Sequence, residues 1–176
     1  MWEDVHERKR TDTAGYRKVH GFVEYMKKHL PLVKWLWVDT CCIKQQSDRE
    51  LSAAINSMFQ WYRDAEVCLA YLEDVSVAGD MTAFEHSVWF RRGWTLQELL
   101  APGVVVFLSR HWGIIGHKGH NSRGRSGMSM QTGPGLEDMI STITAIPREI
   151  LHDYRASLTP STRAWPPPGR GHQFPY

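Results

Sequence analysis

Cysteine is scarce in this 176-residue chain: there are three, and two of them, Cys41 and Cys42, are adjacent. Three thiols do not make a disulfide framework, and adjacent side chains on a strand point to opposite faces, which argues against a zinc site. No apolar run reaches the roughly 18 to 20 residues that a membrane span needs, and the N-terminal sequence MWEDVHERKR has no apolar signal-peptide core. We therefore expect reduced thiols in a cytoplasmic protein that binds no metal and no membrane.

An excess of charge of one sign is also missing. The chain has 21 Lys and Arg residues against 19 Asp and Glu residues, which gives a formal net charge of +2. The locally basic stretch from His117 to Arg125 is interpreted as a solvated loop, so we expect no nucleic-acid partner. No Walker A, G-x-G-x-x-G or H-E-x-x-H sequence is present, which leaves a phosphate-binding loop or a histidine metal site without sequence support.

What the sequence does contain is an alternation of helical patterns and short apolar runs. Helical spacing of apolar residues predicts helices over 16–30, 51–62 behind a capping box at Ser47 and Glu50, about 84–100 with an interruption near Gly93, and about 136–146. Apolar runs at 35–39, 67–72 and 104–109 predict buried strands. This alternation predicts an α/β fold with a parallel sheet and helices on both faces.

Ligands of such a sheet bind where the parallel strands end. The side chains that follow the predicted strands are Asp39, Thr40, Cys41 and Cys42, then Glu73 and Asp74, then Ser109 and Arg110. Asp39 could bind a ligand hydroxyl or act as a turn residue that accepts from nearby backbone N–H groups. Cys41 and Cys42 could be nucleophiles or small buried hydrophobic residues.

Glu98 lies in the sequence WFRRGWTLQELLAP, residues 89–102, among apolar neighbours. Trp94 precedes it by four residues and so shares its helical face. An aromatic neighbour can desolvate a carboxylate and can also stack on a flat ring. The alternative is an outward-facing residue near the helix end, paired with Arg91.

Three sequence blocks resemble the fungal heterokaryon incompatibility (HET) domain. They are WVDTCCI at 37–43, ELSAAINSMFQWYRDAEVCLAYLEDV at 50–75 and WFRRGWTLQELLAP at 89–102. Their order and spacing match the family over about residues 16–153. The resemblance implies a non-self recognition and programmed cell death module that works with protein partners or by self-association.

The HET family is in turn distantly similar to TIR domains, which implies a flavodoxin-like sheet. Several TIR domains cleave NAD with a glutamate four residues after a tryptophan, and Glu98 and Trp94 have that spacing. By this likeness Glu98 is the candidate catalytic residue, Trp94 and Asp39 are candidate binding residues, and NAD is a possible substrate, with no cofactor required.

The sequence departs from the family at both ends. Complete members begin with a segment resembling LSHRWG, which this chain lacks, so we expect the first strand of the family to be missing. We predict an N-terminal extension at 1–15, a partial HET domain at 16–153 and a Pro-rich disordered tail at 154–176. A non-functional fragment is therefore an alternative to the signalling module and to an active NAD glycohydrolase.

Overall fold

The computed structural model describes residues 11–43, 48–119, 128–152, 154 and 174–175. The chain forms two compact units, a smaller one of residues 1–58 with 167–176 and a larger one of residues 59–166, which are described separately below. The capping serine Ser47, most of the predicted tail and most of the N-terminal extension lie outside the described residues. The division of the chain at 16–153 stays a prediction.

The smaller unit begins with helix α2, Ala14–His29. The hydroxyl of Thr13 accepts a hydrogen bond from the backbone N–H of Tyr16 at 3.3 Å, which caps the first turn. Lys27, Lys28 and His29 in the last turn oppose the partial negative charge of that helix end. The other elements of this unit are β1 (Trp35–Leu36), α3 (Asp39–Cys42), β5 (Phe174–Pro175) and the first part of α4 (Asp48–Asp64).

The apolar run 35–39 forms a strand only at its first two residues, where β1 pairs antiparallel with β5. The predicted five-residue strand in a parallel sheet is therefore wrong for this segment. The carbonyl of Val38 accepts from the backbone N–H of Cys42 at 2.8 Å, so the chain turns into α3 instead of continuing as a strand. A short apolar run does not distinguish a buried strand from a helical turn.

The larger unit contains a three-stranded sheet in the order β2 (Cys68–Leu72), β3 (Val104–Ser109), β4 (Ile114–Gly119). Strands β2 and β3 were predicted and are parallel, and all six residues of the central strand β3 are buried. Strand β4 was not predicted and pairs antiparallel with β3, because the short turn between them leaves no room for a crossover. The α/β class is confirmed, whereas the sheet is mixed and not parallel throughout.

The segment predicted as one helix over 84–100 is three short helices. They are α5 (Met81–Glu85), the 3₁₀ helix η1 (Val88–Arg91) and α6 (Thr95–Leu100). Ser87 interrupts the first two, because its hydroxyl accepts from the N–H of Trp89 at 3.2 Å and so starts a new helix. Gly93 lies in the second interruption, as predicted. Helices α7 (Glu137–Thr144) and α8 (Arg148–His152) complete the unit.

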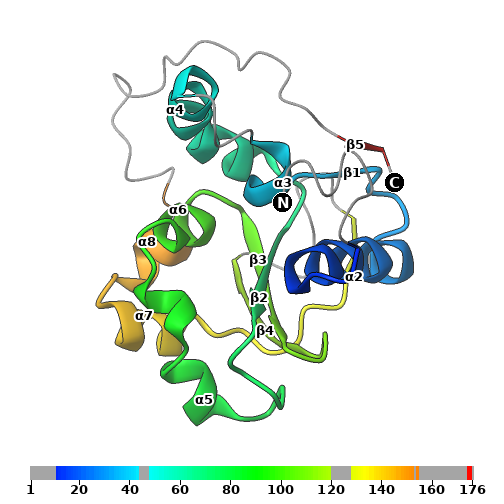
Figure 1. The fold of residues 1–176 in the computed structure, drawn as a ribbon. Coiled ribbons are helices and arrows are strands. Elements are labelled where there is room, and N and C mark those ends of the chain that lie inside the picture. The colour runs from blue at the N-terminus through cyan, green and yellow to red at the C-terminus, as the bar shows by residue number, and fades with distance from the viewer. Residues whose placement is uncertain (1–10, 44–47, 120–127, 153, 155–173, 176) are drawn as a thin grey trace. The chain divides into compact units, whose positions relative to one another are not determined.

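The core of the larger unit lies between these helices and one face of the sheet (Figure 1). The rings of Phe84, Trp89 and Phe107 pack edge to face at centroid distances of 5.2 and 5.5 Å. Each helix from α5 to α8 contributes a buried apolar residue to this cluster. Whether helices cover the second face stays a prediction.

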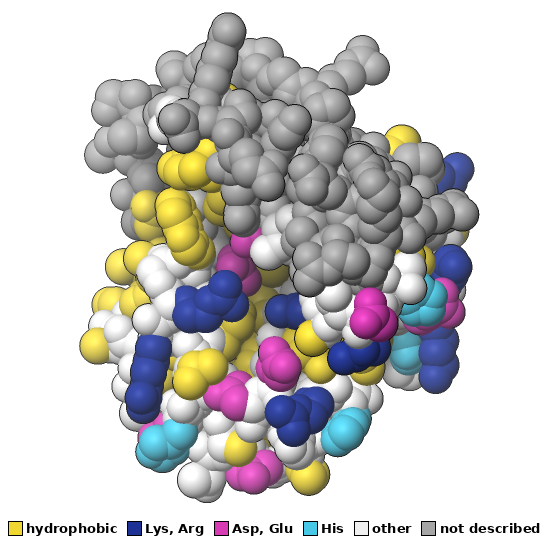
Figure 2. Space-filling view, viewed as in Figure 1, with side chains coloured by type: hydrophobic (Ala, Val, Ile, Leu, Met, Phe, Trp, Pro, Cys, Tyr) yellow, Lys and Arg dark blue, Asp and Glu magenta, His cyan; other side chains and the backbone are white. Residues whose placement is uncertain are grey.

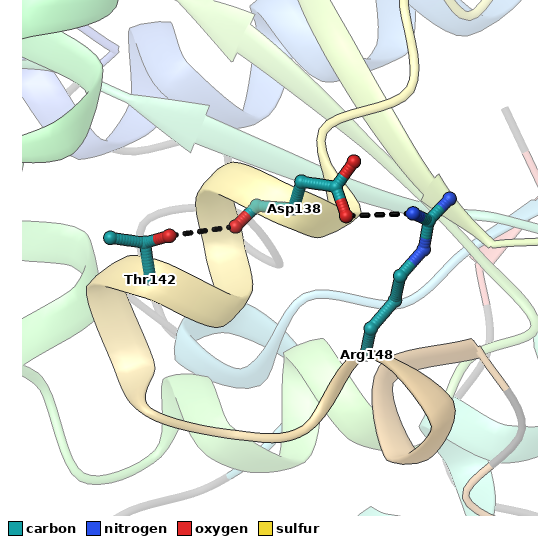
Figure 3. A network of polar contacts seen from close by, with 3 residues as sticks. All are labelled: Asp138, Thr142 and Arg148. Atoms are coloured by element: carbon teal, nitrogen blue, oxygen red, sulfur yellow. Dashed lines mark hydrogen bonds and ion pairs between the residues drawn. The ribbon is translucent and has the colours of Figure 1, made fainter.

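Two connections hold α7 and α8 in place. Asp138 on α7 accepts from the guanidinium of Arg148 on α8 at 2.7 Å, and the hydroxyl of Thr142 donates to the carbonyl of Asp138 at 3.0 Å (Figure 3). At the start of α7, the carboxylate of Glu137 accepts from the N–H of Gly119 at 2.8 Å. The chain before α7 is therefore tied to the end of β4.

His117 strengthens this connection between β4 and the segment before α7. Its N–H donates to the carbonyl of Pro134 at 2.8 Å, and its carbonyl accepts from the N–H of Leu136 at 2.8 Å. These two bonds and the bond of Gly119 form a neck, defined as the pairing of residues 117–119 with residues 134–137.

Candidate functional site

The carboxyl ends of β2 and β3 lie side by side, as the sequence predicts for parallel strands. Asp74 follows β2, and its two carboxylate oxygens accept from the hydroxyl of Ser87 and from the N–H of Val88, each at 2.8 Å. These bonds fix the start of η1 to the end of β2. The carboxylate therefore has a structural role in this arrangement.

The residues that follow β3 also make hydrogen bonds that hold loops in place. The N–H of Arg110 donates to the carbonyl of Val75 at 2.7 Å, and the carbonyl of Arg110 accepts from the hydroxyl of Tyr71 at 2.9 Å. The hydroxyl of Ser109 accepts from the N–H of Gly113 at 3.2 Å and so closes the turn into β4. The structure thus brings Asp74, Ser109 and Arg110 to one edge, where their described bonds hold loops.

At the amino ends of the same strands, the sheet register places two ionisable residues on one face. Val105 of β3 pairs with Cys68 of β2 on one side and with Lys118 of β4 on the other. Residues directly opposite each other in a sheet point to the same face. Cys68, Val105 and Lys118 therefore form a row on the face that the helices cover.

Lys118 is buried in this row, with 2% of its surface exposed. Its ammonium group donates to the carbonyl of Pro102 at 2.9 Å. A buried lysine is rare unless it is paired, because removing the charge from water is costly. Lys118 was not predicted, because the stretch from His117 to Arg125 was interpreted as a solvated loop; the register of β4 places Lys118 in the sheet.

Glu98 lies on α6 and is half-buried. It is close enough to Cys68 to act on it electrostatically: burial raises the pKa of the Cys68 thiol, the carboxylate of Glu98 raises it further, and Lys118 lowers it. Glu98 and Lys118 thus both lie near the amino end of β2. We call Cys68, Glu98 and Lys118 the amino-edge cluster.

Trp94 immediately precedes α6 in helical conformation, and 46% of its surface is exposed. Between Trp94 and the end of the helix lies a second polar side chain, Gln97. Its side-chain oxygen Oε1 is buried, and within the described part of the chain no other buried side-chain nitrogen or oxygen lacks a hydrogen-bond partner. Such exceptions are uncommon in native proteins.

Asp39 belongs to the smaller unit and is the first residue of α3. Its carboxylate accepts from the N–H of Thr40 at 2.6 Å, which agrees with the turn role of the two alternatives. Cys41 and Cys42 are both buried, as the alternative of small hydrophobic residues requires. The roles of Asp39, Trp94 and Glu98 in ligand binding stay predictions.

Neither a metal centre nor a membrane span is found in the part of the chain that the structure describes. No group of three or more His, Cys, Asp or Glu side chains is arranged to hold a metal ion there. None of the helices in the described ranges is long and apolar enough to cross a membrane. On the face shown in Figure 2, Lys and Arg side chains are interspersed with Asp and Glu side chains.

Comparison with known proteins identifies the family. Residues 7–86 match the model described as Heterokaryon incompatibility protein (HET), a range that includes Asp39 and ends before Trp94 and Glu98. The chain is also 40% identical over 158 residues to the vegetative incompatibility protein HET-E-1 of Podospora anserina. That alignment covers 85% of this chain and 10% of the relative, so the chain spans about a tenth of the relative's length. No solved structure matches the chain significantly. The resemblance seen in the three sequence blocks is confirmed, and the chain belongs to the heterokaryon incompatibility (HET) family.

Proposed function

We propose that the chain is a signalling module of fungal vegetative incompatibility, which acts in non-self recognition and programmed cell death. The observation that carries this proposal is the 40% identity to a vegetative incompatibility protein, over an alignment that covers 85% of this chain. The module would work in the cytoplasm through protein partners or self-association, without nucleic acid and without a membrane.

Exposed apolar side chains support a module that acts through protein contacts. In the segment from η1 to α6, Val88 is 58% exposed, Trp94 46% and Leu96 50%. Arg91 and Arg92 in the same segment are exposed as well. Tryptophan and arginine are enriched at protein interfaces, where they contribute much of the binding energy.

A chimera tests the signalling role. The region of HET-E-1 that aligns with this chain would be replaced by this chain in Podospora anserina, and growth arrest would be scored when strains fuse. We expect the chimera to retain incompatibility and a chimera with Phe107→Asp to lose it, because Phe107 is fully buried in the core. A chimera that is expressed and folded but as inactive as a deletion of the region would contradict the proposal.

A second candidate function is hydrolysis of NAD. The observation that favours it is a half-buried carboxylate, Glu98, one helical turn after the exposed ring of Trp94. Glu98 would bind the hydroxyls of the nicotinamide ribose and stabilise the oxocarbenium-like centre as nicotinamide leaves. Trp94 would form a wall of the pocket.

Nicotinamide release from NAD, measured with wild type and with Glu98→Gln, tests this second function. We expect the substitution to lower release by about 100-fold or more, because the amide cannot stabilise the developing positive charge as a carboxylate does. Glu85→Gln is the matched control, since Glu85 is exposed at the end of α5. Equal release by wild type and Glu98→Gln would exclude the catalytic role, and no release by wild type at high protein concentration would leave the signalling module as the function.

We also propose that the sheet belongs to the flavodoxin-like, TIR-like class. The parallel pair β2–β3, joined through α5, η1 and α6, supports this assignment because such a crossover is the repeating unit of that class. An experimental structure of a longer form of the protein that showed no further parallel strand beside this pair would contradict it.

A further inference from the structure

The two adjacent cysteines lie on the single helical turn α3, and both are buried. Both also contact the backbone of Val38: the sulfur of Cys42 accepts from its N–H at 3.3 Å, and the thiol of Cys41 donates to its carbonyl at 3.6 Å. The prediction that they point to opposite faces of a strand is wrong, because residues 39–42 are helical.

The contacts of the two thiols are unequal. The sulfur of Cys42 accepts from the N–H of Val38, whereas the thiol of Cys41 donates to the carbonyl of Val38. The neighbouring thiol of Cys41 and the N–H of Val38 lower the pKa of Cys42. The pKa of Cys41 is raised, first by the neighbouring Cys42 and second by burial. Asp39 opposes ionisation of both thiols. Cys42 is therefore the thiol that carries the charge more readily, with a protonated thiol beside it.

We propose that Cys41 and Cys42 are a redox-active dithiol that a hydroperoxide oxidises to a disulfide between adjacent residues. With hydrogen peroxide, the thiolate of Cys42 attacks one peroxide oxygen, the O–O bond breaks, and Cys42 becomes a sulfenic acid, while the departing hydroxide takes a proton from solvent and leaves as water. The thiol of Cys41 then attacks the sulfur of Cys42, the S–O bond breaks and a second water leaves. Both sulfurs are oxidised by one electron each, and the peroxide is reduced by two electrons.

The disulfide would strain the turn in which it forms. Consecutive Cα atoms across a trans peptide are about 3.8 Å apart, whereas disulfides usually join Cα atoms about 4.4 to 6.8 Å apart. Closing the bond would also remove the hydrogen bond from the thiol of Cys41 to the carbonyl of Val38. The oxidised form should therefore be readily reduced and should loosen α3, which are properties of regulatory disulfides.

Cys68 provides an internal contrast within the same chain. Burial is the largest cause that raises the pKa of its thiol, and no cysteine follows or precedes it along β2. Cys42 is no more exposed, with 6% of its surface accessible against 7% for Cys68, but it lies on a one-turn helix whose N-cap residue, Val38, makes no side-chain cap bond. Local opening of such a short element costs little, and a small peroxide can enter.

The test treats the reduced full-length chain with hydrogen peroxide and maps its thiols after digestion with trypsin. Cleavage after Lys34 and Lys44 places Cys41 and Cys42 together in WLWVDTCCIK, whereas Cys68 falls in another peptide. We expect the first peptide to lose two hydrogens, to resist alkylation and to regain both thiols with dithiothreitol, while Cys68 stays reduced. Oxidation of Cys68 first, or disulfides between chains instead of this one, would overturn the proposal.

Two variants separate the roles of the thiols. Cys41→Ser removes the second thiol, so a sulfenic acid should persist at Cys42 and be trapped by dimedone, which should not label wild type. Cys42→Ser should lose its remaining thiol at position 41 about tenfold more slowly than wild type, because the more readily ionised thiol is gone and burial and Asp39 still raise the pKa of Cys41. Equal rates would overturn the assignment of Cys42 as the attacking thiol. Cys68→Ser is the matched control and should behave as wild type; the wild-type peptide map decides the matter even where a variant does not fold.

Discussion

The two ends of the β2–β3 pair use polar side chains in different ways. At the carboxyl end, Asp74 and Ser109 accept hydrogen bonds that hold the following loops in place. At the amino end, the amino-edge cluster of Cys68, Glu98 and Lys118 combines a buried thiol, a half-buried carboxylate and a buried ammonium group. The side chains at the carboxyl ends of the parallel strands, where ligands of such sheets usually bind, thus hold loops in place, and the buried thiol and ammonium group lie at the other end.

The largest effect is expected at Lys118. Lys118→Ala leaves a cavity, leaves the carbonyl of Pro102 without this donor and removes a positive charge from the amino-edge cluster, so the free energy of unfolding should fall by about 2 to 4 kcal/mol. Urea unfolding followed by circular dichroism measures this. Lys28→Ala, at an exposed position of α2, should change stability by less than about 0.5 kcal/mol. A loss at Lys118 as small as that of Lys28 would mean that the ammonium group is not buried.

At the opposite end, Asp74→Ala should cost less. The substitution removes the acceptor of Ser87 and Val88, but Asp74 is exposed, so water can replace part of what is lost. A loss of about 1 to 2 kcal/mol in the same urea experiment is expected. Asp74→Asn keeps one acceptor oxygen and should lie between wild type and Asp74→Ala. A cost above that of Lys118→Ala would reverse the comparison between the two ends.

The raised pKa of the Cys68 thiol should make the stability of the chain depend on pH. Burial is the largest cause that raises the pKa of its thiol in the folded chain, whereas an unfolded cysteine has a pKa of about 8.5. The contribution of this thiol to stability is thus complete below about pH 8.5 and is lost as the pH rises, because only the unfolded chain then releases the thiol proton. The free energy of unfolding should fall by up to about 1.4 kcal/mol per pH unit in this range. Comparing wild type with Cys68→Ala at about pH 7.5 and about pH 9.5 isolates this slope from other groups. Parallel pH profiles of the two proteins would contradict it.

The smallest effect is expected at Gln97. Its buried Oε1 has no partner in the described structure, so Gln97→Leu removes an unsatisfied acceptor and should be neutral or stabilise the chain by up to about 1 kcal/mol. Thermal unfolding measures the change, with Gln97→Glu as the contrasting variant that should destabilise. A clear loss of stability in Gln97→Leu would show that the oxygen accepts a hydrogen bond in solution.

The sequence predicted those elements whose apolar pattern is unbroken. Runs at 67–72 and 104–109 became β2 and β3, and the helical pattern at 16–30 became α2. Strand β4 was not predicted, because Gly116, His117 and Lys118 show no alternation of apolar and polar residues. The prediction of a strand over 35–39 was wrong because its apolar residues fit a strand, whereas the chain turns into α3.

The site was less predictable than the fold because it depends on register. Glu98 and Trp94 are candidates because of their spacing, which is local information, and their roles stay predictions. Lys118 lies beside Cys68 only through the pairing of both with Val105, and no pattern within IIGHKG indicates a buried lysine. The contacts of Cys41 and Cys42 with the backbone of Val38 likewise depend on whether residues 39–42 are a strand or a helical turn.

The neck formed by residues 117–119 and 134–137 has a consequence for how this chain can change in length. Its bonds at His117 and Gly119 close the segment between β4 and α7 at both ends. The entropy of closing a loop grows only with the logarithm of its length, so doubling the number of residues between the two tie points would cost about 0.6 kcal/mol. Insertions or deletions that spare the buried side chains of Met130 and Thr132 should leave β4 and α7 in register, which makes this segment a suitable place to insert a tag or a reporter.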